Sequence, residues 1–436
     1  MDIRDKLRQI ESLQLKPERT PTFRSSSPVA EYEIGRVIDG FMKLTPHGEF
    51  FCHQRDFPPG HHHGQIEIAS LLSKPAALLS IVGQNQIFDN IDLRKILFLD
   101  TETTGISGGT GMYAFLVGLG YFTETGFRVE QFFLDEIQDE LALLHEINQL
   151  LERHELLITY NGKSFDAPLL ETRNIYHRLS TILTSRPHLD LLHSARRLWK
   201  SSLPDCALTT IESHVLKHQR VGDIPSYLIP QLYFDYVHDG DARPLRPVFY
   251  HNQQDILAMA AIMVKFLAIL ECPLHESVSA PEILALARMY ENMARFERAL
   301  ELYAHLFERH WENKYRPEAL FRSALIYKRQ EKWAEAAEAW ETYLRTEPYH
   351  PLPYVELAKY YEHRMRDFIK AKGLVEKALS ELNVMEGIGR KIEWLVYKDD
   401  LEYRRNRLIR KINSAAALKN QPKVDFHQIG FDESPR

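Results

Sequence analysis

The order of apolar runs between residues 91 and 180 constrains the fold more than any other feature of this sequence. KILFLD is a short apolar run ending in Asp100, as buried strands do, and MYAFLVGLGYF and FRVEQFFL are two further strand-like runs. DELALLHEINQLLER then has helical apolar spacing, LLITYN is a fourth strand, and SFDAPLLETRNIYHRL begins another helix. The order βββαβα, with further helices to residue 270, predicts an α/β domain with a mixed sheet.

Five side chains able to bind a metal or transfer a proton fall on these predicted elements. Asp100 and Glu102 stand at positions i and i+2 at the end of the first strand, so both project from one face of it. Asp166 follows a later strand, at the start of a helix. His251 and Asp255 are four residues apart in HNQQDILAMAAIMVKF, which places them on one face of a late helix.

Each of these pieces alone has an ordinary structural interpretation. A DxE at a strand end is common, and an acid at a helix start favours the helix macrodipole. An HxxxD on a helix is usually a surface pair or part of a capped helix start. The joint occurrence of all three, in this order and on these elements, indicates a catalytic site.

FLDTETTG, YNGKSFD and HNQQD resemble the three exonuclease motifs of the DEDD superfamily in its histidine subtype (DEDDh), over residues of about 90 to 270. The resemblance implies an RNase H-like fold and 3′→5′ release of mononucleotides. PHLDLLHSARRLWK and CALTTIESHVL resemble a bacterial group in which this domain precedes tetratricopeptide repeats. That group includes the exonuclease of a mitomycin repair pair, so the resemblance also implies DNA repair alongside a superfamily 2 helicase.

The residue types indicate which cofactor and mechanism to expect. Hard oxygen ligands without thiolates select Mg²⁺ or Mn²⁺. Two such ions, about 3.5–4 Å apart, can activate a water and stabilise the leaving oxygen during attack on phosphorus. We therefore assign Asp100, Glu102, Asp166 and Asp255 as metal ligands, with Asp100 as the bridge. His251 is assigned as the general base, because an imidazole titrates near neutral pH.

Supporting roles are more open. Asp190 in PHLDLL either joins the acidic cluster or caps the helix LLHSARRLWK, and the cap is the preferred interpretation. Asn161 either contacts substrate or turns the chain. Thr103, Thr104 and Gly105 would lie beside the terminal nucleotide in this fold. Basic side chains near the motifs could contact phosphates, although a solvated helix face is the simpler account of each. They are Lys163, Arg196, Arg197, Lys200, Lys217 and Arg220.

The C-terminal part of the chain repeats itself. Tyrosine and alanine positions recur at the roughly 34-residue period of tetratricopeptide repeats, which are helix pairs that bury apolar surface by stacking. These positions are Tyr290, Tyr327 and Tyr361, and Ala299, Ala336 and Ala371. Such an array commonly binds a protein partner, and a purely structural role is the alternative. A basic helix that follows either contacts nucleic acid or caps the array.

These observations divide the chain into five expected parts. Residues 1–30 form a flexible arm and residues 31–90 an N-terminal accessory segment. The RNase H-like exonuclease domain covers 91–272, and the tetratricopeptide repeats with their basic capping helix cover 279–412. Residues 413–436 form a disordered tail. Within the accessory segment, His61-His62-His63 could bind a metal, but a loop with exposed or packed histidines is preferred.

Composition narrows the class of protein. Hydrophobic residues make up 44% and charged residues 26%, as in soluble globular proteins. No apolar run reaches the roughly 18–20 residues of a membrane span, and MDIRDKLRQIESLQLK lacks the apolar core of a signal peptide, so we expect a cytoplasmic protein with no membrane contact. The three distant cysteines argue against a disulfide framework and a structural zinc site. A net charge of −6 decides nothing, because a nuclease site itself concentrates carboxylates.

Three hypotheses remain in play. The first is a metal-dependent DNA exonuclease acting in repair and recruited through its repeats. The second is an RNA exonuclease of the same fold, because discrimination rests on contacts near the 2′-position that the motifs do not specify. The third is a non-catalytic scaffold, against which the intact set of five residues argues.

Overall fold

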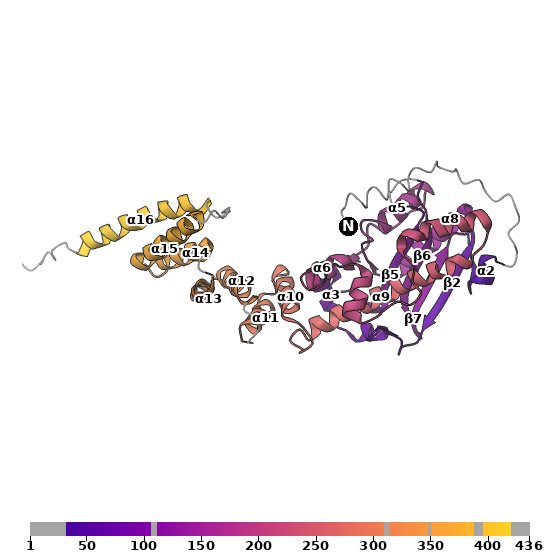
Figure 1. The fold of residues 1–436 in the computed structure, drawn as a ribbon, viewed down its shortest axis with the longest axis horizontal. Helices are drawn as coiled ribbons and strands as arrows, with labels where there is room; N and C mark the ends of the chain where they lie inside the picture. Colours follow the sequence, from indigo (N-terminus) through magenta and orange to yellow (C-terminus); the bar gives the residue numbers. More distant parts are fainter. Residues whose placement is uncertain (1–31, 106–110, 309–313, 348–349, 388–395, 420–436) are drawn as a thin grey trace, which may run out of the picture. The chain divides into compact units, whose positions relative to one another are not determined.

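The structure is a computed structural model, which describes residues 32–105, 111–308, 314–347, 350–387 and 396–419 (Figure 1). The arm expected at residues 1–30 lies outside the described residues, as does the expected tail beyond Lys419. The chain divides into two compact units, Met1–Pro281 and Glu282–Arg436.

A seven-stranded mixed sheet organises the first unit, in the order β1-β2-β7-β6-β5-β8-β9 (Figure 1). Its strands are β1 Phe41–Thr45, β2 Gly48–Phe57, β5 Ile96–Thr103, β6 Ala114–Thr123, β7 Gly126–Phe133, β8 Leu156–Thr159 and β9 His188–Asp190. The β5 strand pairs antiparallel with β6 and parallel with β8, and β9 extends the parallel side. The predicted α/β fold, a mixed sheet flanked by helices, is confirmed.

Two of these strands come from the segment that the sequence analysis set apart as an accessory. The β1 and β2 strands form a hairpin, and β2 pairs antiparallel with β7 over Phe51–Phe57. The sheet therefore begins about fifty residues before residue 91, the expected start of the α/β domain. Phe50, Phe51 and Cys52 are buried in this extension.

Helices cover both faces of the sheet. They are α2 Ile34–Val37, α3 Leu79–Gly83, α4 Glu140–Arg153, α5 Asp166–Tyr176, α6 Leu191–Trp199, α7 Leu208–Ile211, α8 Ile229–Asp239 and α9 Arg246–Glu271. Successive side chains of a strand point to opposite faces of the sheet, so Phe132 packs into the layer on one face and Phe133 into the layer on the other. Phe132 packs on Phe50, with 4.8 Å between ring centroids, whereas Phe133 packs on Phe249 of α9 at 5.5 Å.

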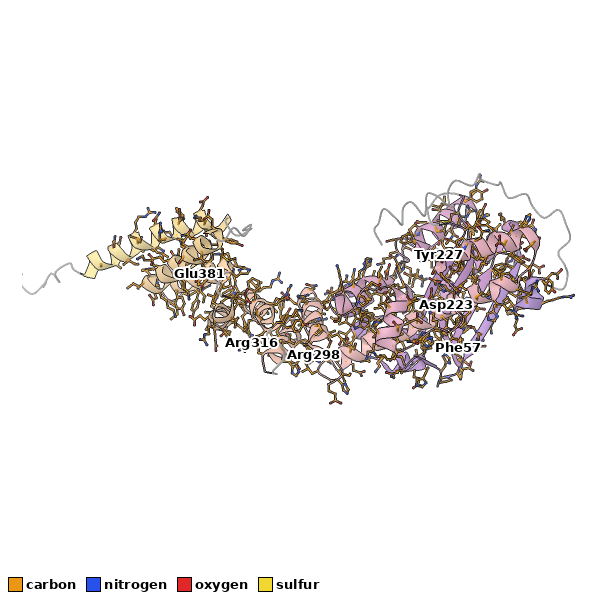
Figure 2. The ribbon with its side chains drawn as sticks, viewed as in Figure 1. Phe57, Asp223, Tyr227, Arg298, Arg316 and Glu381 are labelled. Carbon is orange, nitrogen blue, oxygen red and sulfur yellow. The ribbon has the colours of Figure 1, made fainter. Side chains whose placement is uncertain are left out.

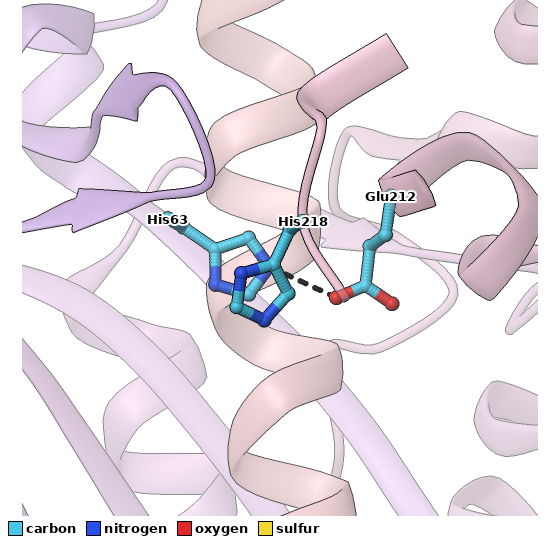
Figure 3. A group of neighbouring side chains, drawn as sticks. All are labelled: His63, Glu212 and His218. Carbon is cyan, nitrogen blue, oxygen red and sulfur yellow. Dashed lines mark hydrogen bonds and ion pairs between the residues drawn. The ribbon is translucent and has the colours of Figure 1, made fainter. Parts of the chain in front are cut away.

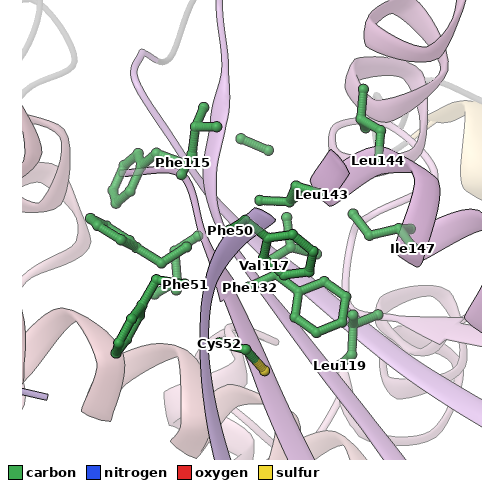
Figure 4. Close-up of a cluster of buried hydrophobic side chains, with 14 of the residues drawn as sticks. Phe50, Phe51, Cys52, Phe115, Val117, Leu119, Phe132, Leu143, Leu144 and Ile147 are labelled. Carbon is green, nitrogen blue, oxygen red and sulfur yellow. The ribbon is translucent and has the colours of Figure 1, made fainter. Parts of the chain in front are cut away.

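The apolar side chains of this core are drawn in Figure 4. Leu143, Leu144 and Ile147 of α4 are buried in the same cluster as Val117 and Phe132 of the sheet. Their spacing along α4 is the helical spacing that predicted this helix from DELALLHEINQLLER. Burial of each such side chain stabilises the fold by roughly 1.5–3 kcal/mol.

The α9 helix is the main exception to the expectation that no segment resembles a membrane span. The helical stretch Arg243–Glu271 is long and apolar enough to cross a membrane, by length and composition only, with a mean hydropathy of 1.6 in its most apolar window. Of that window, 83% is buried inside the structure, as in the core helix of a soluble domain. We therefore read α9 as a core helix.

The second unit is helical and consists of consecutive packed helices. They are α10 Ala280–Asn292, α11 Phe296–Glu308, α12 Arg316–Arg329, α13 Trp333–Thr346, α14 Pro351–His363, α15 Phe368–Gly387 and α16 Val396–Lys419. Short turns join the first three pairs, and each turn contains a residue with positive φ, namely Ala294, Glu331 and Arg366. The recurrence of one turn geometry at the sequence period indicates repeated helix pairs. The α16 helix runs to Lys419, so the expected helix end at residue 412 was wrong.

Side chains pack throughout both units, as Figure 2 shows. In the second unit, Ala336, Ala371 and Ala299 are fully buried, which accounts for the small side chain that recurs at these positions. Trp340 and Leu357 belong to one cluster with Ala336, and Val375 and Leu408 belong to the next cluster along the chain.

Candidate functional site

Asp100 and Glu102 lie near the carboxyl end of β5, opposite Gly118 and Leu116 of β6. Their i, i+2 spacing directs both carboxylates to the same face of the sheet, as the sequence predicted. The β5–β6 register shifts between Glu102 and Thr103. Bulges of this kind often occur next to active sites, where they re-aim a side chain.

Two glycines of β6 allow α9 to approach that face closely. A Cβ on Gly118 would lie 2.2 Å from Oδ1 of Asn252, and one on Gly120 would lie 2.4 Å from Cγ2 of Ile256. Any side chain at these two positions would push α9 off the sheet. The pattern LVGLG in this strand thus positions the helix that carries His251 and Asp255.

A buried amide network connects α9 to the carboxylate of Asp100. Asn252 donates from Nδ2 to Oδ2 of Asp100 at 2.9 Å. Gln131 of β7 donates to Oδ1 of Asn252 at 2.8 Å, and also to the backbone oxygen of Phe249 at 2.8 Å. Both amides are buried, so this network fixes the orientation of Asn252 and, through it, of Asp100.

Asp166 is the first residue of α5 and is only 8% exposed. Its Oδ1 accepts a hydrogen bond from the Thr101 hydroxyl, which ties it to β5. The preceding turn has to be tight, because a Cβ on Gly162 would lie 2.7 Å from Oδ2 of Asp166. Asn161 has a φ of 67°, the left-handed conformation that Asn tolerates, so the turn interpretation of Asn161 describes its place in the fold.

Asp190 supports this turn with both of its carboxylate oxygens. Oδ1 accepts from the backbone N–H groups of Asn161 at 2.8 Å and Leu192 at 3.0 Å, and Oδ2 accepts from that of Lys163 at 3.2 Å. Asp190 is therefore the N-cap of α6 and, at the same time, a clamp on the loop before Asp166. The preferred cap interpretation matches these contacts.

His251 and Asp255 face the carboxylates from α9, one turn apart. The Nε2 atom of His251 lies 3.6 Å from Oδ2 of Asp255, and ligand atoms of Glu102, His251 and Asp255 all lie within 4.8 Å of one another. The Nδ1 atom of His251 contacts Oδ1 of Asp223 at 2.7 Å. Asp223, labelled in Figure 2, therefore orients the imidazole, a role that sequence reasoning missed.

Burial and mutual repulsion dominate the electrostatics of this carboxylate cluster, which we define as Asp100, Glu102, Asp166 and Asp255. Burial, then repulsion from Asp255 and Glu102, raises the pKa of Asp100 well above its usual value. Burial and repulsion from Asp255 do the same to the pKa of Glu102. Burial raises the pKa of Asp166 to about 6, against the hydrogen bond from Thr101, and burial also raises the pKa of Asp255.

Such a cluster is unfavourable to ionise without nearby positive charge. Arg220 supplies part of that charge, with its guanidinium 2.5 Å from Oδ1 of Asp255. The same guanidinium contacts Asp223 at 3.2 Å and Glu212 at 2.6 Å, and its side chain is only 6% exposed. Arg220 is therefore an internal counter-charge, and the solvated-face interpretation of it is wrong, whereas its contact with a phosphate stays a prediction. The donor set, four carboxylates and one oriented imidazole, fits hard divalent cations.

Comparison with known proteins agrees with this geometry. Residues 97–267 match the RNase H superfamily. The chain is also 30% identical over 335 residues to an uncharacterized protein, YprB, of Bacillus subtilis (strain 168), covering 75% of this chain and 79% of that protein. The chain belongs to the YprB family. Its RNase H superfamily domain points to a nuclease, a class of hydrolase.

A solved structure with a distant likeness is the family B DNA polymerase from the hyperthermophilic archaeon Pyrobaculum calidifontis. It is 14% identical and has a TM-score of 0.34. The match covers 50% of this family member and 31% of the polymerase chain, so it spans less than a third of that protein. A likeness of this size does not bear on function.

The expected substrate contacts of this YprB-family chain make local hydrogen bonds. The hydroxyl of Thr103 donates to the backbone oxygen of Gly105 at 2.9 Å, and that of Thr104 accepts from the backbone N–H of Tyr113 at 3.0 Å. The second of these bonds joins described residues on the two sides of the segment 106–110. Substrate contacts of Thr103, Thr104, Gly105 and Asn161 stay a prediction.

Proposed function

We propose that this YprB-family chain is a metal-dependent DNA exonuclease that hydrolyses phosphodiester bonds from the 3′ end. The observation that carries the proposal is the convergence of the carboxylate cluster, drawn from β5, α5 and α9, beside His251. Three separate elements contribute these side chains, and α9 is held at the sheet by glycines that leave room for nothing larger. A structural ion pair would not require this accumulation of buried acids.

The residues that would hold two Mg²⁺ or Mn²⁺ ions are Asp100, Glu102, Asp166 and Asp255. When bound, such ions polarise the phosphodiester, lower the pKa of a bound water and stabilise the leaving oxygen. Their binding would also remove the repulsion that raises the pKa of Asp100 and Glu102.

The residues of the chain have distinct parts in the proposed reaction. His251 accepts the proton of the attacking water at Nε2, because Nδ1 is engaged by the Asp223 carboxylate. Asp223 also stabilises the imidazolium that forms. Asn252 holds the Asp100 carboxylate in place, so its position does not depend on substrate.

The polarity, the choice of DNA and the biological setting are the finer parts of the proposal. They rest on the resemblance of FLDTETTG, YNGKSFD and HNQQD to the DEDDh motifs. We propose a cytoplasmic role in DNA repair, with tetratricopeptide repeats in the second unit as the docking surface for a protein partner such as a superfamily 2 helicase. The regularly recurring turns at Ala294, Glu331 and Arg366 support the repeat assignment.

The test is degradation of end-labelled duplex DNA, single-stranded DNA and RNA by the full-length protein, with Mg²⁺, Mn²⁺ or EDTA. Glu102→Gln provides an isosteric loss of one proposed ligand. Its matched control is Glu124→Gln, the same change at an exposed acid in the β6–β7 turn. We expect metal-dependent loss of 3′-terminal nucleotides from DNA with wild type and Glu124→Gln, and none with Glu102→Gln.

Three outcomes would contradict the proposal in different ways. Degradation of RNA alone would show that the substrate is RNA and not DNA, while the proposed catalytic site would still stand. Equal activity in Glu102→Gln would remove the carboxylate cluster from the chemistry. No degradation by folded wild-type protein under any condition would favour a non-catalytic scaffold.

A further inference from the structure

A small hairpin brings one histidine of His61-His62-His63 into the interior of the first unit. The strands β3 His62–His63 and β4 Ile66–Glu67 pair antiparallel, and Gly64 between them has a φ of 60°. A Cβ on Gly64 would lie 2.2 Å from the backbone oxygen of Leu216, the same oxygen that accepts from Gln65 N at 2.9 Å. The hairpin is thus docked on the segment around Leu216, and His63 is only 2% exposed.

The segment that receives the hairpin has an uncommon backbone. Glu212–Leu216 forms a single π-helical turn, and Lys217 then adopts a φ of 56°. The backbone N–H of His218 returns to the oxygen of Glu212 at 2.9 Å. This reversal places the side chains of Glu212 and His218 next to each other, and π-helical turns are frequent at functional sites.

Three side chains converge there, and Figure 3 shows them facing one another. The Nε2 atom of His63 lies 2.9 Å from Oε1 of Glu212, and the rings of His63 and His218 lie against each other, tilted by 33°, with 4.0 Å between centroids. One ligand atom from each side chain lies within 4.8 Å of the other two. Nε2 of His218 meets Oε1 of Gln254 at 3.2 Å, which leaves Nδ1 of a neutral imidazole unprotonated.

We propose that His63, Glu212 and His218, here called the imidazole cluster, form a second metal site that binds Zn²⁺. Two imidazoles and one carboxylate are a known ligand set for zinc, with a coordination position left for water. Imidazole nitrogen favours Zn²⁺ over Mg²⁺, so this site and the carboxylate cluster would hold different ions. The distant cysteines exclude a zinc site built from thiolates, whereas this site would be built from histidines.

An ion pair between His63 and Glu212 is the simpler alternative. It accounts for the 2.9 Å contact but not for the second, half-buried imidazole of His218, whose ring centroid lies 4.0 Å from that of His63. The surrounding charge also favours a cation.

Arg220 contacts three carboxylates, those of Glu212, Asp223 and Asp255. One guanidinium against three carboxylates leaves a net negative charge that another divalent ion would offset. Glu212 presents Oε1 to His63, while its Oε2 accepts from Nε of Arg220 at 2.8 Å. An ion at the imidazole cluster would therefore fix Glu212 without displacing Arg220, and so hold the loop that carries Arg220 towards Asp255.

The experiment uses Co²⁺ as a spectroscopic substitute for Zn²⁺ in full-length protein stripped with a chelator. Mg²⁺ is kept in excess, because it competes at carboxylates but not at imidazoles. The protein carries Glu102→Gln, so the reading is independent of nuclease activity. We expect one Co²⁺ per chain with the visible absorption of imidazole ligation, displaced by Zn²⁺.

His63→Gln and His218→Gln should each weaken Co²⁺ binding at least roughly tenfold, since each removes a ligand. His62→Gln and His214→Gln are matched controls, because both histidines are exposed neighbours in sequence, and they should bind as the parent does. Circular dichroism confirms that each variant is folded. Unchanged Co²⁺ binding in both ligand variants, or no Co²⁺ binding by the folded parent, would overturn the proposal.

Discussion

The carboxylate cluster and the imidazole cluster lie at two ends of one ion-pair network yet are built in opposite ways. Strands and long helices carry the carboxylate cluster, and its donors are oxygens whose repulsion raises their own pKa values. A two-residue hairpin strand and a π-helical turn carry the imidazole cluster, and its donors are mostly nitrogens. Regular elements thus hold a set of four carboxylates, whereas turns hold a set with a single carboxylate.

The difference in donor atoms indicates which metal ion each cluster can bind. A set of oxygens suits ions that bind weakly enough to exchange and to coordinate substrate phosphates. Two imidazoles, one of them buried in a docked hairpin, suit an ion that stays in place. Arg220 joins the two through Glu212 and Asp255, so a change at either cluster reaches the other through a single guanidinium.

The first prediction tests whether His251 belongs with the ligands or acts as the base. For His251→Asn we expect turnover to fall roughly 10³-fold, about 4 kcal/mol, because positioned general bases contribute on this scale. Apparent Mg²⁺ affinity should stay essentially unchanged. Single-turnover kinetics across a Mg²⁺ titration measure both. A parallel loss of metal affinity would make His251 a ligand, and the two clusters would then be the same kind of site.

The second prediction removes the link between the clusters. For Arg220→Met we expect a loss of about 3–5 kcal/mol in the free energy of unfolding in EDTA, because three carboxylates lose a buried counter-charge. Divalent ions should restore part of it. Urea unfolding with and without Mg²⁺ and Zn²⁺ measures the effect. The control is Arg153→Met, at an exposed arginine that ends α4. An equal loss of unfolding free energy in both variants would show that Arg220 does not connect the two clusters.

Periodicity explains why the carboxylate cluster could be predicted. Asp100 and Glu102 follow the two-residue repeat of a strand, and His251 and Asp255 follow the four-residue spacing of a helix. A correct assignment of elements therefore placed them on shared faces. The same alternation and helical spacing gave the mixed sheet and its α4 helix. The β2 strand escaped because its apolar residues (FFC) and polar residues (HQRD) follow one another in blocks and do not alternate, and β1 is its short, mostly exposed hairpin partner.

Long-range contacts explain what was missed. Asp223 bonds to His251, and Asn252 bonds to Asp100. A short-range sequence pattern cannot predict hydrogen-bond partners of this kind. His63 meets Glu212 across 149 residues, through a turn that depends on Gly64. A histidine in a Gly-rich turn looks exposed in sequence, because its burial is decided by a segment far along the chain.

The third prediction tests whether Asp190 is a helix cap or a further metal ligand of the carboxylate cluster. For Asp190→Ala we expect the free energy of unfolding to fall by about 2–3 kcal/mol, because three backbone N–H groups lose one buried acceptor. Asp190→Asn keeps one acceptor oxygen and should lose less. Urea unfolding gives the stability, and a Mn²⁺ titration of each variant gives the affinity. A loss of Mn²⁺ affinity in Asp190→Asn without a loss of stability would make Asp190 a ligand after all.

The fourth prediction separates the acid sensitivity of the scaffold from that of the imidazole cluster. His188 contacts the Thr159 hydroxyl at 2.8 Å, and burial, followed by the charge of Lys163, lowers its pKa from 6.5 to about 4. Between these values the unfolded chain binds more protons than the folded one, so stability is intact above about pH 6.5 and falls as the pH drops towards 4.

Partial exposure reduces the expected loss from this group to about 2 kcal/mol. His188→Gln keeps a side chain able to bond to Thr159 but cannot titrate, so its loss between pH 7 and pH 4.5 should be smaller than that of wild type by this amount. Urea unfolding in EDTA at both pH values measures the difference. If the variant loses as much as wild type, the acid sensitivity lies elsewhere, and comparing His218→Gln in the same assay tests whether it lies in the imidazole cluster.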